Sequence, residues 1–90
     1  MAKKNSCYHY YVLVFTDEGP IYVTDANNGD RYAYWDKEQK PMEFSATYAD
    51  DMVLGLNLNS HHAVLIKSRF EIDHQPYRYE SYDLKFEKRE

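Results

Sequence analysis

The order of apolar and polar residues changes period along the chain, and each period predicts a different element. Residues 8–16 are β-branched and aromatic, with apolar side chains on both alternating faces. This pattern is typical of a central strand covered on both sides. The run ends at an Asp-Glu-Gly-Pro sequence (residues 17–20), a turn composition. A second short strand is expected over residues 21–24, with Ile21 and Val23 on one face.

A tight turn and a third strand are expected next. Asn28 and Gly29 form the dipeptide best suited to a two-residue type I′ hairpin, because both central residues of that turn take positive φ. Residues 31–35 then return antiparallel as the third strand. The polar sequence 36–41 connects this strand to the next element.

A helical period replaces the strand pattern over residues 45–58. One apolar stripe at spacing i, i+3, i+4 and i+7 consists of Ala49, Met52, Val53 and Leu56. Ser45 or Thr47 can cap the helix, and Asp50 and Asp51 lie near its positively polarised end. The glycine in this stretch weakens the helix by about 1 kcal/mol relative to alanine.

The last regular pattern is a long alternation over residues 63–73, which predicts one strand. Pro76 ends it, and the apolar alternation at 82–86 indicates either a fifth strand or a packed tail. The order β-β-β-α-β(-β) predicts an α+β fold. It contains a mainly antiparallel sheet of four to five strands with one helix packed on one face. We expect residues 1–90 to form a single domain with loose termini at 1–7 and 87–90.

The composition narrows the class of protein. Aliphatic residues are few, and ten tyrosines supply much of the missing apolar mass. We find no signal-peptide pattern and no apolar stretch near the roughly 18 residues that a membrane span needs. One cysteine forms no internal disulfide, which favours a reducing, cytoplasmic location. The net charge of −4 argues against general binding to a nucleic-acid backbone.

The sequence contains few residue patterns that indicate catalysis or metal binding. Cys7 and His9 would share a strand face as two metal ligands might, but the other histidines (His61, His62 and His74) lack zinc spacing. A calcium-loop match over residues 25–36 fails, because its glycine is one position early and its last residue is Asp36. No nucleophile with its base and no glycine-rich phosphate loop occurs. We therefore expect no enzyme activity, metal, cofactor or small-molecule substrate.

The tyrosines are the feature that stands out. The candidate interaction surface consists of Tyr32, Tyr34, Trp35, Tyr77, Arg78 and Tyr79. Such aromatics can anchor a protein interface or stack on nucleic-acid bases. The strand propensity of tyrosine and the need to fill the core explain these aromatic residues equally well.

Three strings carry a resemblance: Tyr-Val-Leu-Val-Phe-Thr-Asp-Glu-Gly-Pro, Trp-Asp-Lys-Glu-Gln-Lys-Pro and Gln-Pro-Tyr-Arg-Tyr. Over residues 10–79 the chain resembles small uncharacterised proteins of Gram-positive bacteria and their phages or plasmids. The resemblance implies a small accessory factor acting on another macromolecule, and it assigns no functional residues.

Two functions remain open. The first is a non-enzymatic protein-interaction module, with self-association as a homodimer as one form. The second is a nucleic-acid-associated protein, either a weak single-strand binder or an acidic mimic that inhibits a nucleic-acid enzyme. Basic residues gathered around exposed tyrosines would favour the single-strand binder. One helix covers only one sheet face, so we expect the tail, a second copy or a partner to cover the other.

Overall fold

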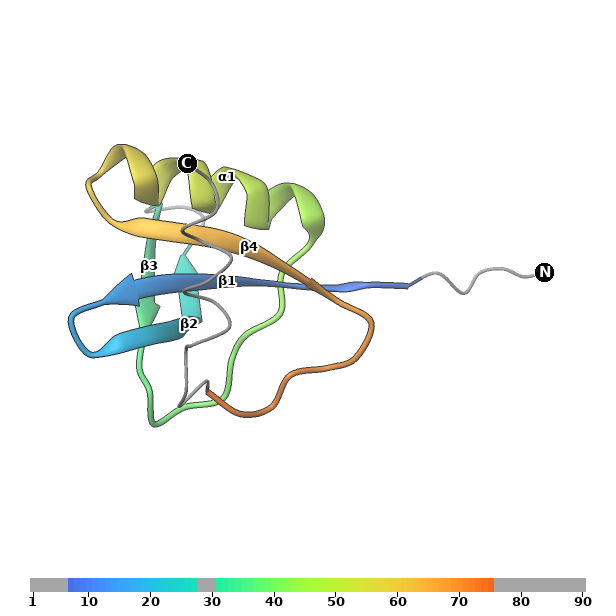
Figure 1. The fold of residues 1–90 in the computed structure, drawn as a ribbon. Helices are drawn as coiled ribbons and strands as arrows, with labels where there is room; N and C mark the ends of the chain where they lie inside the picture. The colour runs from blue at the N-terminus through green and yellow to red at the C-terminus, as the bar shows by residue number, and fades with distance from the viewer. Residues whose placement is uncertain (1–6, 28–30, 76–90) are drawn as a thin grey trace, which may run out of the picture.

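The computed structural model describes residues 7–27 and 31–75, which form a four-stranded antiparallel sheet with one helix packed on it (Figure 1). The elements are β1 (His9–Thr16), β2 (Gly19–Asn27), β3 (Tyr32–Trp35), α1 (Ala46–Leu58) and β4 (His62–Ser68). The strand order is β3-β2-β1-β4. This arrangement confirms the predicted α+β fold and the internal position of the first strand. No helix in the described ranges is long and apolar enough to cross a membrane.

Two strands differ from their predicted bounds by more than one residue. The strand predicted over 63–73 is wrong beyond Ser68, because the Ser68 hydroxyl accepts from Phe70 N at 3.0 Å and closes a turn. The strand predicted over 21–24 begins earlier, at Gly19, and continues to Asn27. Gly19 has φ 103°, a value that glycine adopts without strain, and it pairs directly with Thr16 across a two-residue loop.

Some predicted features fall outside the described ranges. They are residues 1–6 and 87–90 of the predicted loose termini, the Asn28-Gly29 turn and the alternation at 82–86.

The connection before the helix passes between two diverging strands. β1 and β2 pair from Thr16 back to Leu13 and then separate. Beyond that point Met42 N donates to Val23 O at 3.0 Å on β2, and Phe44 N donates to Tyr10 O at 2.9 Å on β1. This connection therefore supplies the hydrogen bonds that the two strands no longer give each other.

The helix begins at its predicted cap. Ser45, and not Thr47, is the N-cap residue, and its hydroxyl accepts from Tyr48 N at 3.2 Å. Ala49 is fully buried in the core between the helix and the sheet. The rest of the predicted stripe (Met52, Val53 and Leu56) packs against the same core. The first turn contains no acidic residue, so Asp50 and Asp51 lie beyond the position where the helix dipole favours them most.

The opposite face of the sheet carries a second core cluster of Tyr11, Leu13 and Tyr22. Chain that follows β4 packs on it: Ile72 contacts the cluster, and its N–H donates to the Tyr11 hydroxyl at 2.9 Å. Within the described residues, part of the expected cover therefore comes from the segment directly after β4. The tail residues predicted for this role lie beyond those residues.

Candidate functional site

The predicted interaction surface divides between the two faces of β3. Side chains alternate along a strand, so Tyr32 and Tyr34 lie on one face and are 45% and 53% exposed. Trp35 lies on the other face, where it packs against the core under α1. Its ring meets His61 edge-on at a centroid distance of 5.1 Å. The remaining predicted residues (Tyr77, Arg78 and Tyr79) are outside the described ranges.

The two exposed tyrosines contact each other. The rings of Tyr32 and Tyr34 lie edge to face, with centroids 5.1 Å apart and an interplanar angle of 85°. The Tyr34 hydroxyl donates to that of Tyr32, and this hydrogen bond raises the pKa of Tyr34 above its ordinary value. The pair therefore forms a preordered surface that is apolar in its rings and polar at its tips.

The tyrosine pair lies on an edge strand. β3 pairs with β2 along Asn27↔Tyr32 to Val23↔Trp35, and no described strand pairs with its other side. The N–H and C=O groups on that side of an edge strand can pair with another extended chain. β4 is the other edge of the sheet.

A groove of about 310 Å³ lies between β3 and α1. Tyr32 and Ala33 line it on the strand side, and Tyr48, Gly55 and Leu56 line it on the helix side. A Cβ atom added at Gly55 would meet no atom within 4 Å. The missing side chain thus leaves open space in the helix wall, next to the edge strand.

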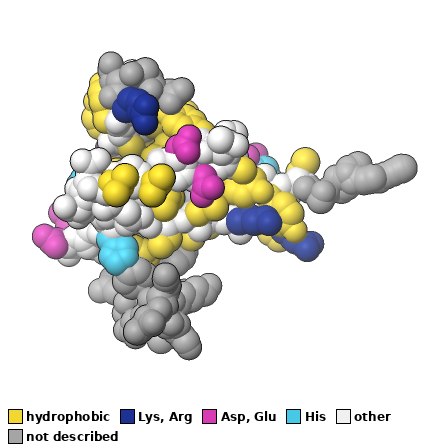
Figure 2. Space-filling view, turned by 90° about the horizontal axis from the view of Figure 1, so that it is seen from above, with side chains coloured by type: hydrophobic (Ala, Val, Ile, Leu, Met, Phe, Trp, Pro, Cys, Tyr) yellow, Lys and Arg dark blue, Asp and Glu magenta, His cyan; other side chains and the backbone are white. Residues whose placement is uncertain are grey.

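A second aromatic cluster lies at the opposite edge of the sheet. Lys67 Nζ sits 4.3 Å from the centroid of the Tyr8 ring, and the Arg69 guanidinium lies 5.8 Å from it. Phe70 beside them is 78% exposed. Figure 2 shows basic side chains next to apolar ones on one side of the molecule. Arg31 lines the β3 groove instead, so the described basic residues do not form one patch.

The histidines do not gather as a metal site. His61 contacts Trp35, His62 contacts Phe15 edge-on, and His74 pairs with Asp73 at 3.3 Å. His9 instead lies next to Glu43, with His9 Nδ1 2.8 Å from Glu43 Oε2. Sequence spacing gave no indication of this contact, because 34 residues separate the two positions.

No protein family, curated protein or solved structure matches the chain. Its function is therefore inferred from the geometry of these surfaces.

Proposed function

We propose that the chain is a small, non-enzymatic cytoplasmic module that binds an extended segment of a partner protein along β3. The observation that carries this proposal is the ordered Tyr32–Tyr34 pair beside an open groove, on a strand edge with which no other described strand pairs. The exposed free thiol of Cys7 suits a reducing compartment.

The mode of binding follows from the edge strand. An extended peptide can add to β3 through main-chain hydrogen bonds, which provide affinity without regard to sequence. Its alternate side chains then point to opposite faces of the sheet. On one face they meet the rings of Tyr32 and Tyr34, and on the other they reach the groove at Gly55. Tyrosine is enriched among residues that dominate binding energy, which supports this role for the pair.

The size of the surface favours a peptide over a second copy of the chain. β3 has four residues, whereas a stable interface buries about 800 Å² on each partner. A two-fold contact between two such short edges would fall well below that area. The groove of about 310 Å³ lies at the lower end of binding-pocket volumes, and it suits one or two peptide side chains.

The test is a selection of binders from a phage-displayed library of random peptides, followed by affinity measurements on variants. Gly55→Met places a side chain in the groove, and Tyr34→Ala removes half of the tyrosine pair. We expect each to weaken the selected peptides at least tenfold. Leu65→Ala, an exposed apolar change on β4, is the matched control and leaves binding unchanged. Full affinity in both Gly55→Met and Tyr34→Ala would contradict the proposal, as would a concentration-dependent dimer that Tyr34→Ala dissociates.

The contact of Lys67 and Arg69 with Tyr8 supports a second candidate, weak single-strand binding. It is the weaker proposal, because the Lys67 ammonium already lies over the ring face on which a base would stack. A mobility shift with single-stranded RNA at about 50 mM salt tests it. Binding that Lys67→Gln weakens and the matched change Arg31→Gln does not would favour this candidate. No shift would exclude it.

A further inference from the structure

A cluster of potential metal ligands lies at the start of β1, away from the β3 groove. His9, Glu43 and Glu71 each offer one ligand atom, and these three atoms lie within 4.8 Å of one another. Within the described ranges, this is the one such group of three or more histidine, cysteine or acidic side chains. His9 is half-buried and the two glutamates are exposed.

The fold holds all three residues in place through their neighbours. His9 pairs with Ser68 of β4. Glu43 lies between two residues whose N–H groups donate to the sheet, Met42 to Val23 O and Phe44 to Tyr10 O.

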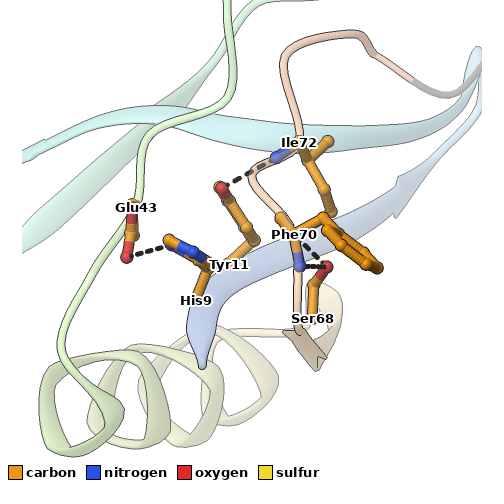
Figure 3. Close-up of polar contacts among 6 residues, drawn as sticks. All are labelled: His9, Tyr11, Glu43, Ser68, Phe70 and Ile72. Atoms are coloured by element: carbon orange, nitrogen blue, oxygen red, sulfur yellow. Dashed lines mark hydrogen bonds and ion pairs between the residues drawn. The ribbon is translucent and has the colours of Figure 1, made fainter. Parts of the chain in front are cut away.

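Glu71 is fixed in the same manner. It lies between Phe70, whose N–H donates to the Ser68 hydroxyl, and Ile72, whose N–H donates to the Tyr11 hydroxyl. Figure 3 shows these two contacts beside the His9–Glu43 contact. The cluster is thus built from three chain segments, each tied to β1, β2 or β4 by hydrogen bonds next to the ligand residue.

Among the described residues, Glu43 has His9 as its ion-pair partner, and no lysine or arginine forms an ion pair with Glu43 or Glu71. A cation at this position would relieve the repulsion between the two carboxylates.

We propose that His9, Glu43 and Glu71 bind a divalent transition-metal ion, with Zn²⁺ as the representative ion. One imidazole nitrogen and two carboxylate oxygens are ligands that Zn²⁺ accepts, and three protein ligands leave a position open to water.

Binding requires movement of the side chains. Bonds of about 2.1 Å at tetrahedral angles place ligand atoms about 3.4 Å apart, so a pair as far apart as 4.8 Å has to close by about 1.4 Å, which rotation of the two exposed glutamate side chains can supply. The ion takes the lone pair of His9 Nδ1, so it replaces the direct contact between this nitrogen and Glu43 Oε2.

The expected consequence is a metal cross-link between β1, the connection before α1 and the segment after β4. An ion that binds only the folded chain raises the melting temperature as its concentration rises. The proposal is independent of the peptide groove, whose variants leave this cluster unchanged.

The experiment is a calorimetric titration of the full chain with ZnCl₂, paired with melting curves. We expect one Zn²⁺ per chain and a melting temperature that rises with Zn²⁺ concentration. His9→Ala, Glu43→Gln and Glu71→Gln each weaken binding at least tenfold. Glu71→Gln melts like the wild type without metal, which separates a ligand role from a structural one. The same concentrations of Ca²⁺ have no effect.

Two control variants distinguish this site from adventitious binding. His61→Ala removes an exposed histidine, and Cys7→Ser removes the exposed thiol; both should retain full affinity. Binding lost in Cys7→Ser but kept in Glu71→Gln would assign the ion to other ligands and overturn the proposal. Equal binding of Zn²⁺ by all five variants would also overturn it. So would the absence of binding to the wild type at about 100 µM Zn²⁺, because a Kd of that size corresponds to a binding free energy of only about 5.5 kcal/mol.

Discussion

The backbone N–H of Tyr22 on β2 donates to Oε1 of Gln75 at 2.9 Å, although 53 residues separate them. The amide nitrogen of Gln75 donates in turn to Gln39 O at 2.7 Å and to Asp36 O at 3.3 Å. Gln75 is 7% exposed and is the one buried polar side chain of the described ranges. It therefore joins β2, the turn after β3 and the end of the segment that follows β4.

Replacing this glutamine should destabilise the fold. Gln75→Ala leaves the buried Tyr22 N–H without its acceptor, which we expect to cost about 1–3 kcal/mol in the free energy of unfolding. Gln39→Ala is the matched control, because its side chain is exposed and only its backbone oxygen contacts Gln75. We expect it to stay within about 0.5 kcal/mol. Urea unfolding curves measure both, and equal losses would show that the Gln75 contacts contribute nothing specific.

Periodicity predicted the elements that share a core but not the contacts between distant segments. Val12 and Ala49 are buried where their spacing places them. The end of β4 was missed because Phe70 and Ile72 continue the strand alternation, while the Ser68 hydroxyl closes a turn. That turn depends on one side-chain conformation, which a pattern of apolar residues does not record.

In the candidate sites too, local patterns predict the strand faces but not the contacts between distant segments. The shared face of Tyr32 and Tyr34, and the opposite position of Trp35, follow from the two-residue period of a strand. The neighbours of His9 do not follow from any local pattern. Glu43 reaches His9 only because the connection before α1 passes between β1 and β2, where these strands diverge.

The tight packing of the helix on the sheet can be tested at Ala49. This side chain is fully buried in the core cluster that also contains Val12, Val14 and Val23. Ala49→Leu adds three carbon atoms to a filled core, and overpacking of this kind costs about 1–3 kcal/mol. Asp50→Leu makes a similar change at the next, exposed position, where we expect a change within about 0.5 kcal/mol. Thermal unfolding compares the two, and equal shifts would contradict the assigned helix face.

We expect Gly55 to lower the stability of the helix while its missing side chain leaves the groove open. A Cβ at this position meets no atom within 4 Å, and alanine favours a helix over glycine by about 0.8–1 kcal/mol. Gly55→Ala should therefore raise the free energy of unfolding by about that amount. For a domain of this size the melting temperature would rise by about 4–8 °C. A lower melting temperature would show that the groove wall is occupied by other chain atoms.

The hydroxyl contact between the exposed tyrosines makes a prediction about pH. Because the neutral Tyr34 hydroxyl donates to Tyr32, the proton is held more tightly and the pKa of Tyr34 is raised. Tyr32→Phe removes the acceptor and should lower the pKa of Tyr34 toward 10.0, the ordinary value for tyrosine. An NMR titration of the tyrosine Cζ resonances measures this change. Tyr48→Phe is the control, because the Tyr48 ring packs edge-on against Phe44.

The same contact determines the sign of its effect on stability. Above the ordinary tyrosine pKa of about 10, the unfolded chain loses the Tyr34 proton while the folded chain still holds it. The unfolded state then binds fewer protons, so stability falls as pH rises through this range. We expect the decline between about pH 9.5 and 11 to be less steep in Tyr32→Phe than in the wild type. Identical pH dependence in urea unfolding, with an unchanged Tyr34 pKa, would show that the two hydroxyls do not interact in solution.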